Sequence, residues 1–232
     1  MFPLIKRGIS YGGNAQFSSQ PLPNVPDAFC ELAIPQPDRF YGYTTGPFGG
    51  FSKKENMVLS HPSMIRYAMP TVDGAFPFLI FELKSPAKGG TLWHADNQAA
   101  GSGAHCVSSM RYLMQQANGE DAAVPSTKAL AFTVCVDGRY VEFNIHWYSE
   151  GTEEYMMSCI DSFRTVQEKD IQECRNWIKN IIEYCLGQCR TEIVNALETL
   201  HPFPPTWSNK KPRTRGGSST PATSFTTTSG NK

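Results

Sequence analysis

An apolar run that ends in two opposite charges is the clearest feature of the hydrophobic pattern. Residues 78–81 are all apolar, and Glu82 and Lys84 follow with one apolar residue between them. Side chains at positions i and i+2 of a strand point to the same side, so this acid and this amine share one face. We therefore predict a central, buried strand over residues 76–84 that ends in a charged pair.

Two segments show the 3.6-residue period of an amphipathic helix. Residues 170–200 predict the longer one, which ends before His201-Pro202 because proline cannot continue a helix. The other helix is predicted from about Asp96 to Ala117, with Asp96 as the N-cap. Its apolar and small residues fall on one stripe: Ala99, Gly103, Cys106, Val107, Met110, Leu113, Met114 and Ala117.

The rest of the pattern predicts strands and irregular segments. Residues 129–136 and 139–147 flank Asp137-Gly138, a pair preferred in two-residue type I′ turns, and predict a β-hairpin. Shorter features are a strand at 29–34, a strand at 39–43, a helical or irregular stretch at 53–69 and a short apolar segment at 153–164. In the second hairpin arm, the polar residues expected to face outward are Tyr140, Glu142, Asn144 and His146.

These elements predict one α/β domain with a mixed central β-sheet flanked by helices. Residues 1–28 are rich in Gly, Ser, Pro, Asn and Gln, which predicts an irregular or disordered leader. The domain is expected over residues 29–203. Residues 204–232 are rich in Ser, Thr, Gly and Lys, with little to bury, and predict a disordered tail.

Composition narrows the compartment and the kind of partner. The 232 residues carry 21 basic and 21 acidic side chains, so any contact with nucleic acid must rely on local basic groups. Seven cysteines without a C-x-x-C pair, and no secretory signal, predict a reduced intracellular protein, cytoplasmic or nuclear. No apolar run approaches the ~20 residues that cross a bilayer. The basic residues at 210–215 are a candidate nuclear localisation signal or phosphate contact.

The charged pair at the strand end has the chemistry of a metal and phosphate site. A hard cation such as Mg²⁺ takes oxygen ligands, so Glu82 needs a further carboxylate beside it. Two aspartates precede it in the sequence: Asp38, which follows a proline, and Asp73, nine residues before Glu82. Each also has a simpler interpretation, Asp38 as a strand-entry residue and Asp73 as part of an Asp-Gly turn. The choice between them stays open at this point.

The helix that follows the strand presents a polar stripe at helical spacing, formed by Gln98, Ser102, His105 and Ser109. In an early turn of this helix, Gln98 is placed to orient a phosphate or a metal-bound water, and the helix N-terminus itself attracts anions. The simpler interpretation of the stripe is a solvated polar face.

Several stretches together resemble the PD-(D/E)xK nuclease superfamily, and more closely the uncharacterised nuclease-like domains found in many fungal proteins. The resemblance spans roughly residues 29–200. It rests on Pro37-Asp38-Arg39-Phe40-Tyr41-Gly42-Tyr43, on Phe76-Pro77-Phe78-Leu79-Ile80-Phe81-Glu82-Leu83-Lys84, on residues 91–103 with Gln98, and on residues 175–182 of the last helix.

This resemblance implies a restriction-endonuclease-like core that hydrolyses phosphodiester bonds of DNA or RNA. Asp38, or alternatively Asp73, would ligate Mg²⁺ or Mn²⁺ together with Glu82 and the backbone carbonyl of Leu83. Lys84 would position or deprotonate the attacking water, and Gln98 would be an accessory catalytic residue. Nucleic acid is then the expected partner.

Two further interpretations remain from other classes. A catalytically inactive relative of these nucleases would act as a nucleic-acid- or protein-binding module, which the neutral net charge favours. A metal-dependent hydrolase built on His94, Asp96 and His105 is disfavoured, because no third ligand is in register with the two histidines. Cys185 and Cys189, one helical turn apart, are expected to be core thiols rather than metal ligands.

Overall fold

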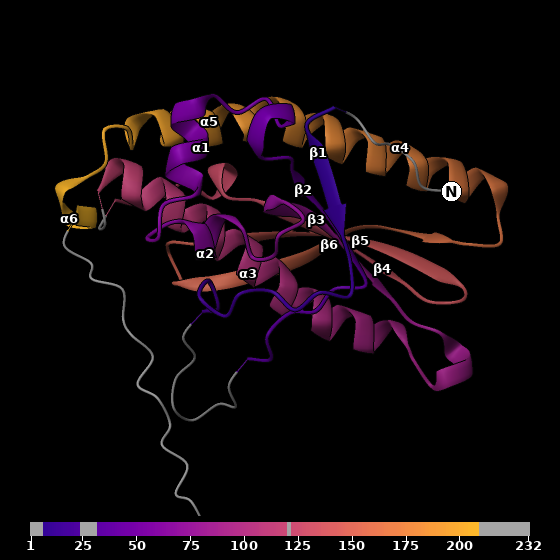
Figure 1. Cartoon of the computed structure of the whole chain (residues 1–232). Helices are drawn as coiled ribbons and strands as arrows, with labels where there is room; N and C mark the ends of the chain where they lie inside the picture. The colour runs from indigo at the N-terminus through magenta and orange to yellow at the C-terminus, as the bar shows by residue number, and fades with distance from the viewer. Residues whose placement is uncertain (1–6, 24–31, 120–121, 209–232) are drawn as a thin grey trace, which may run out of the picture.

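The computed structural model describes residues 7–23, 32–119 and 122–208, which form a mixed β-sheet with helices on both faces (Figure 1). The sheet has six strands in the order β1-β2-β3-β4-β5-β6. Neighbouring strands are antiparallel at every pairing except one, between β3 and β4. The predicted α/β class with a mixed central sheet is therefore confirmed.

The predicted central strand is β3 (Ala75–Leu83), which lies between β2 (Arg39–Tyr43) and β4 (Ala131–Val136). Every residue of β3 except the last is buried, as expected for a strand covered on both faces. Parallel strands need a crossover connection, and here it is the long helix α3 (Leu92–Asn118).

The helices divide between the two faces of the sheet. α3 lies across one face, and α4 (Glu168–Tyr184) with α5 (Arg190–Thr199) lies across the other (Figure 1). The five residues Cys185–Cys189 between α4 and α5 form a π-helical turn. This continuous structure confirms the long helix predicted over 170–200.

Shorter elements complete the described fold. β5 (Tyr140–Ser149) and β6 (Glu154–Arg164) extend the sheet beyond β4, and β1 (Ile9–Gly12) lies at its opposite edge. Two short helices precede β3, and one follows α5. They are α1 (Lys53–Leu59), α2 (Ile65–Ala68) and α6 (Pro205–Ser208).

The prediction that residues 1–28 form an irregular leader is wrong for residues 9–12, whereas residues 13–23 form no helix or strand. Ile9–Gly12 is a strand that pairs with β2, and Phe17 is buried against Phe40 with ring centroids 5.1 Å apart. Pairing with a neighbouring strand outweighs weak local propensity. Of the strand expected at 29–34, residues 29–31 lie outside the described part, and 32–34 form no strand. The tail from residue 209 onward also lies outside it.

The hairpin prediction is confirmed in its strands and wrong in its turn. β4 and β5 pair from Ala131↔His146 to Val136↔Val141, but the connection spans residues 137–139, and neither Asp137 nor Gly138 has the positive φ of a type I′ turn. Instead, the Asp137 carboxylate accepts hydrogen bonds from the backbone N–H groups of Arg139 (2.7 Å) and Tyr140 (2.9 Å). The side chain of Asp137 replaces the expected backbone geometry.

Two polar residues predicted to face outward from the second hairpin arm are buried. Asn144 is 1% exposed and His146 is 2% exposed, because α3 covers this face while α4 covers the other. His146 Nε2 is 2.9 Å from Thr133 Oγ1, so the imidazole has a buried partner. The short apolar segment predicted at 153–164 is a complete edge strand, β6.

The predicted start of α3 is also wrong, by four residues. The helix begins at Leu92 after an extended Thr91, and Asp96 lies inside it rather than at its N-cap. The residues that extend the buried stripe toward the N-terminus are small, Ala95 and Ala99, and they pack against Cys135. A stripe of small side chains gives a weak periodic signal, which explains why the sequence prediction began too late.

A glycine allows α3 to approach the sheet closely. A Cβ atom added at Gly103 would lie 2.2–2.4 Å from three ring atoms of His146, closer than any non-bonded contact permits. On the same helix, a Cβ at Gly101 would have no atom within 4 Å.

We expect Gly103→Ala to lower the free energy of unfolding by about 1–3 kcal/mol, because the added methyl group forces α3 and β5 apart. Gly101→Ala is the matched control. Alanine favours helix over glycine by up to about 1 kcal/mol, so this variant is expected to be as stable as wild type or more stable. Urea unfolding followed by circular dichroism measures both, and equal stability of the two variants would contradict the close approach.

Candidate functional site

Glu82 is a buried acid at the end of the central strand. Its side chain is 2% exposed and lies under α3, where the Ser102 hydroxyl donates a 3.1 Å hydrogen bond to Oε1. The alternation along β3 sends Phe81 to the opposite face, where it is also buried. A carboxylate therefore faces α3 at the position that the sequence pattern predicted.

Asp38 reaches the same strand end from the neighbouring strand. The last residue pair between β2 and β3 is Arg39↔Phe81. Asp38 precedes Arg39, and its carboxylate bonds to β3 just beyond this last main-chain pair. Its Oδ2 accepts a 2.6 Å hydrogen bond from the Leu83 backbone N–H and lies 3.8 Å from Lys84 Nζ. Both contacts of the Asp38 carboxylate at this strand end are made by Oδ2.

Asp73 occupies a different place in the fold. It lies in the turn that enters β3, where its carboxylate is beside Gly12 of the edge strand β1, which is separated from β3 by β2. Its backbone carbonyl accepts a hydrogen bond from the Ser10 hydroxyl, and its N–H donates to Thr71 Oγ1 at 3.2 Å. This is the arrangement of a turn residue. The geometry therefore favours Asp38 over Asp73 as the partner of Glu82.

Leu83 and Lys84 complete the strand end. Leu83 is the last residue of β3, is 48% exposed, and lies between Glu82 and Lys84 with its N–H bonded to Asp38. Lys84 donates its backbone N–H to Val136 of β4 at 2.8 Å, which fixes its position while its ammonium group faces Asp38.

Burial dominates the electrostatics of the site. It is the largest cause of the raised pKa of Glu82, which is about 7, and the charge of Asp38 acts in the same direction. The hydrogen bond from Ser102 and the charge of Lys84 act in the opposite direction, but they do not offset the loss of water around the carboxylate. Two carboxylates and one ammonium group share the strand end.

The polar stripe of α3 is mostly buried, so its simpler interpretation as a solvated face is wrong. Ser102, His105 and Ser109 are each at most 1% exposed. They bond in turn to Glu82, to the Ser18 carbonyl (2.8 Å from His105 Nε2) and to the Tyr67 carbonyl. These contacts join α3 to three separate segments, because buried polar groups need hydrogen-bond partners.

Gln98 is the member of the stripe that stays exposed. On α3, Gln98 precedes Ser102 by one helical turn, about 6 Å along the helix axis. On the strand, Lys84 lies two residues after Glu82, about 7 Å along the strand axis. Since Ser102 contacts Glu82 and α3 returns over the sheet, Gln98 is at the level of Lys84. The amide and the ammonium group thus belong to the same end of the sheet.

Sequence reasoning missed a second acidic group beside the site. Strand register places Glu82, Cys135 and Glu142 side by side across three strands. Asp96 lies above Cys135 on α3, and after burial a hydrogen bond from the thiol to Asp96 further raises the pKa of Cys135. Asp96 Oδ1 is buried without a hydrogen-bond partner among the described residues. The periodic spacing of Asp96 with Ala99 could have revealed its inward orientation.

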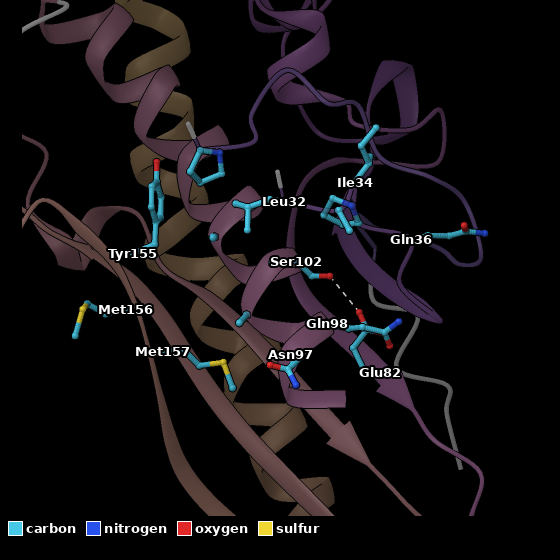
Figure 2. A pocket seen from close by; sticks show the side chains of 16 residues that line it. Leu32, Ile34, Gln36, Glu82, Asn97, Gln98, Ser102, Tyr155, Met156 and Met157 are labelled. Atoms are coloured by element: carbon cyan, nitrogen blue, oxygen red, sulfur yellow. Dashed lines mark hydrogen bonds between the residues drawn. The ribbon is translucent and has the colours of Figure 1, made fainter. Parts of the chain in front are cut away.

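A cavity of about 850 Å³ opens onto Glu82 (Figure 2). Gln98 and Ser102 of α3 line it together with Glu82. One flank is formed by residues 32–36, and the other by Tyr155, Met156 and Met157 of β6. The candidate site is therefore connected to a groove that crosses the outer side of α3.

The residues offer a limited set of metal ligands. In the ranges that the structure describes, no three Asp, Glu, His or Cys side chains form a group suited to a metal ion. Asp38 and Glu82 nevertheless supply two carboxylates with a main-chain carbonyl beside them. Mg²⁺ keeps several waters and binds through one or two carboxylates plus substrate oxygens, so this donor set fits Mg²⁺ or Mn²⁺.

Comparison with known proteins places the chain in a family whose function is not known. A family model described as a domain of unknown function, DUF7924, matches residues 14–197, which is more than half of the chain. The chain belongs to this family. No curated protein and no solved structure matches it significantly. The DUF7924 region contains Asp38, Glu82, Lys84 and Gln98.

In this DUF7924 domain the two histidines of the alternative metal site lie far apart. His94 and His105 are about 16 Å apart along α3, since they are eleven residues apart on one helix. His105 is buried against Phe17, with ring centroids 5.1 Å apart. Cys185 and Cys189 are buried in the core, and the Cys185 carbonyl accepts a 2.8 Å hydrogen bond from Tyr43 Oη.

Other properties of the domain concern its thiols and its helices. All six cysteines within the described part are free. No helix in that part is both long and apolar enough to cross a membrane.

We expect Glu82→Gln to gain stability relative to wild type as the pH rises. The folded state holds the pKa of Glu82 near 7, above its ordinary 4.5, so the folded protein binds the extra proton between these values. Wild-type stability from this group is present at pH 4.5 and is lost by pH 7, by about 3 kcal/mol at most. The neutral amide does not titrate.

Urea unfolding of both proteins in chelator at pH 5 and pH 8 measures this change. Glu198→Gln, at an exposed position on α5, is the control. It measures how far the loss of one negative charge changes the free energy of unfolding without any burial. A difference between wild type and Glu82→Gln that is the same at the two pH values would show that Glu82 titrates normally.

Proposed function

We propose that this DUF7924 domain is a metal-dependent nuclease that hydrolyses phosphodiester bonds of DNA or RNA. The observation that carries the proposal is the convergence of Asp38, Glu82 and Lys84 at the end of β3. Asp38 comes from 45 residues away, yet its carboxylate bonds to the N–H between the other two residues. A strand end that needed only a cap would not also require a buried acid and an ammonium group.

Asp38, Glu82 and the Leu83 carbonyl would hold Mg²⁺ or Mn²⁺. When bound, such an ion lowers the pKa of a coordinated water and shields the charge of a phosphate. The 3.8 Å contact between Lys84 Nζ and Asp38 supports a cation site, because a positive charge already neutralises this carboxylate. Displacement from Asp38 would free Lys84 to face the substrate.

The side chains then have separate roles in hydrolysis. Lys84 orients the attacking water and stabilises negative charge that develops on the phosphoryl oxygens. Ser102 holds the Glu82 carboxylate in place through its hydrogen bond to Oε1. Gln98, exposed at the level of Lys84, orients a phosphate oxygen or the water through its amide.

The beginning of α3 supports phosphate binding at the same end of the sheet. The helix has no acidic residue in its first turn and no side-chain cap at Thr91, and the first N–H groups that bond to the Thr91 carbonyl are those of His94 and Ala95. The N–H groups of Leu92 and Trp93 are thus the ones placed to meet an anion. Lys88, in the short turn Pro86–Lys88 between β3 and α3, adds a positive charge. A phosphate near Lys84 would thus meet favourable charge from two directions.

Two observations favour a second candidate function, a catalytically inactive nuclease-like module that binds nucleic acid or protein. The chain has no net charge, and the site offers two carboxylates rather than three. Such a module would keep the fold and the groove without hydrolysis. For either function we propose an intracellular location, cytoplasmic or nuclear, since the described cysteines are free thiols.

The purified protein is expected to cleave DNA or RNA oligonucleotides in Mg²⁺ or Mn²⁺ and to stop in excess chelator. Asp38→Asn, Glu82→Gln and Lys84→Met should each lower the cleavage rate by about 10²-fold or more, since each removes charge stabilisation at the phosphate. Mn²⁺ should also raise the melting temperature of wild type, and Glu82→Gln should lose this shift.

Asp73→Asn is the matched control, because it removes an aspartate in a turn where asparagine is equally suited. It should cleave like wild type. Cleavage that persists in chelator, or that Glu82→Gln leaves unchanged, would exclude this site as the nuclease centre. Oligonucleotide binding without cleavage under any metal would instead support the inactive module.

A further inference from the structure

The groove that crosses α3 suggests which form of nucleic acid the site accepts. We propose that it holds unpaired bases next to the scissile phosphate, so that the substrate is single-stranded DNA or RNA rather than a duplex. This inference rests on the proposed nuclease function. It comes from the charge of the groove, from the shape of its floor and from the polar groups along it.

The described lining of the groove contains no Lys, Arg or His, and Glu82 is its one charged residue. A duplex presents phosphates on its outside and needs several cations to neutralise them. This groove cannot supply them. Bases are neutral, so they can enter where a phosphate backbone cannot.

The floor of the groove is a stripe of small residues on α3. Ala100, Gly101 and Ala104 line it, and a Cβ atom added at Gly101 would have no atom within 4 Å. Small side chains let a flat ring approach the helix backbone closely. The volume of about 850 Å³ is enough for more than one base.

The sides of the groove combine apolar surface with amides. Leu32 and Ile34, each about one-third exposed, form one flank, and Met156 and Met157 form the other (Figure 2). Carboxamides line it at three positions, Gln36, Asn97 and Gln98. Neutral amides can donate to and accept from base edges, whereas apolar side chains cover base faces, as in sites that bind unstacked bases.

Trp93 extends the same stripe toward the N-terminus of α3. Positions 93, 97, 100 and 104 follow one another at helical spacing, and Asn97 Nδ2 donates a 2.9 Å hydrogen bond to the Trp93 carbonyl. The Trp93 side chain is 69% exposed, which is unusual for an indole. An exposed indole beside a base-binding groove offers a stacking surface that any base can use.

The phosphates would then lie along the other side of Glu82. Lys84 and Lys88 are at the strand end and in the turn before α3, outside the groove lining. Negative backbone and neutral bases are thus separated on opposite sides of the reacting centre. Only a strand whose bases are unpaired can adopt this arrangement.

Binding of a fluorescent 12-nucleotide single strand and of the matching duplex, measured by anisotropy in chelator, tests the proposal without cleavage. The single strand should bind at least tenfold more tightly. Gly101→Leu fills the floor of the groove and should weaken single-strand binding about tenfold or more. Trp93→Ala should weaken it by a similar factor. Gly187→Leu is the control: it is also exposed and helical, with no atom within 4 Å of an added Cβ, but it lies between α4 and α5.

Equal affinity for duplex and single strand, or unchanged binding by Gly101→Leu, would overturn the proposal. Metal-dependent cleavage of duplex at the single-strand rate would also overturn it and leave the nuclease function intact. Preferential single-strand binding that Gly101→Leu abolishes and Gly187→Leu preserves would support the groove even if no metal produced cleavage. That last result would reject the nuclease function alone.

Discussion

The parallel pairing of β3 with β4 is the constraint on which the rest of the structure depends. Parallel neighbours need a crossover, and the crossover is α3, which must lie across one face of the sheet. This placement buries Glu82 beneath Ser102 and brings the helix against His146, where only glycine fits at position 103. The site and the groove both result from where one helix crosses.

Buried titratable groups on α3 and beneath it give the domain opposing responses to pH. The loss of water lowers the pKa of His105 and His146 to about 4, so both are neutral when folded. The free energy of unfolding therefore falls as the pH falls from about 6.5 to 4, because the unfolded chain binds protons that the buried histidines do not. Burial raises the pKa of Glu82 instead, and its contribution is lost as the pH rises toward 7. Without a bound cation, Glu82 is therefore only partly ionised at neutral pH, and ionising it further costs stability.

This unfavourable charge gives the proposed function a physical basis. A structural carboxylate is normally placed where water or a permanent cation can reach it. Lys84 is instead paired with the more exposed Asp38, and the described groove in front of Glu82 contains no basic side chain. A metal ion with a phosphate would satisfy both carboxylates and leave the neutral groove to neutral parts of the substrate.

The sequence by itself determined the features that depend on near neighbours in the chain. The period of two along β3 placed Glu82 and Lys84 on one face, and the apolar run predicted a central strand. The choice of Asp38 over Asp73 came only from tertiary structure, because it depends on the register between β2 and β3. The position of Asp96 above Cys135 likewise required the packing of α3 on the sheet. Local periodicity records which side a residue faces, whereas only packing decides what lies opposite.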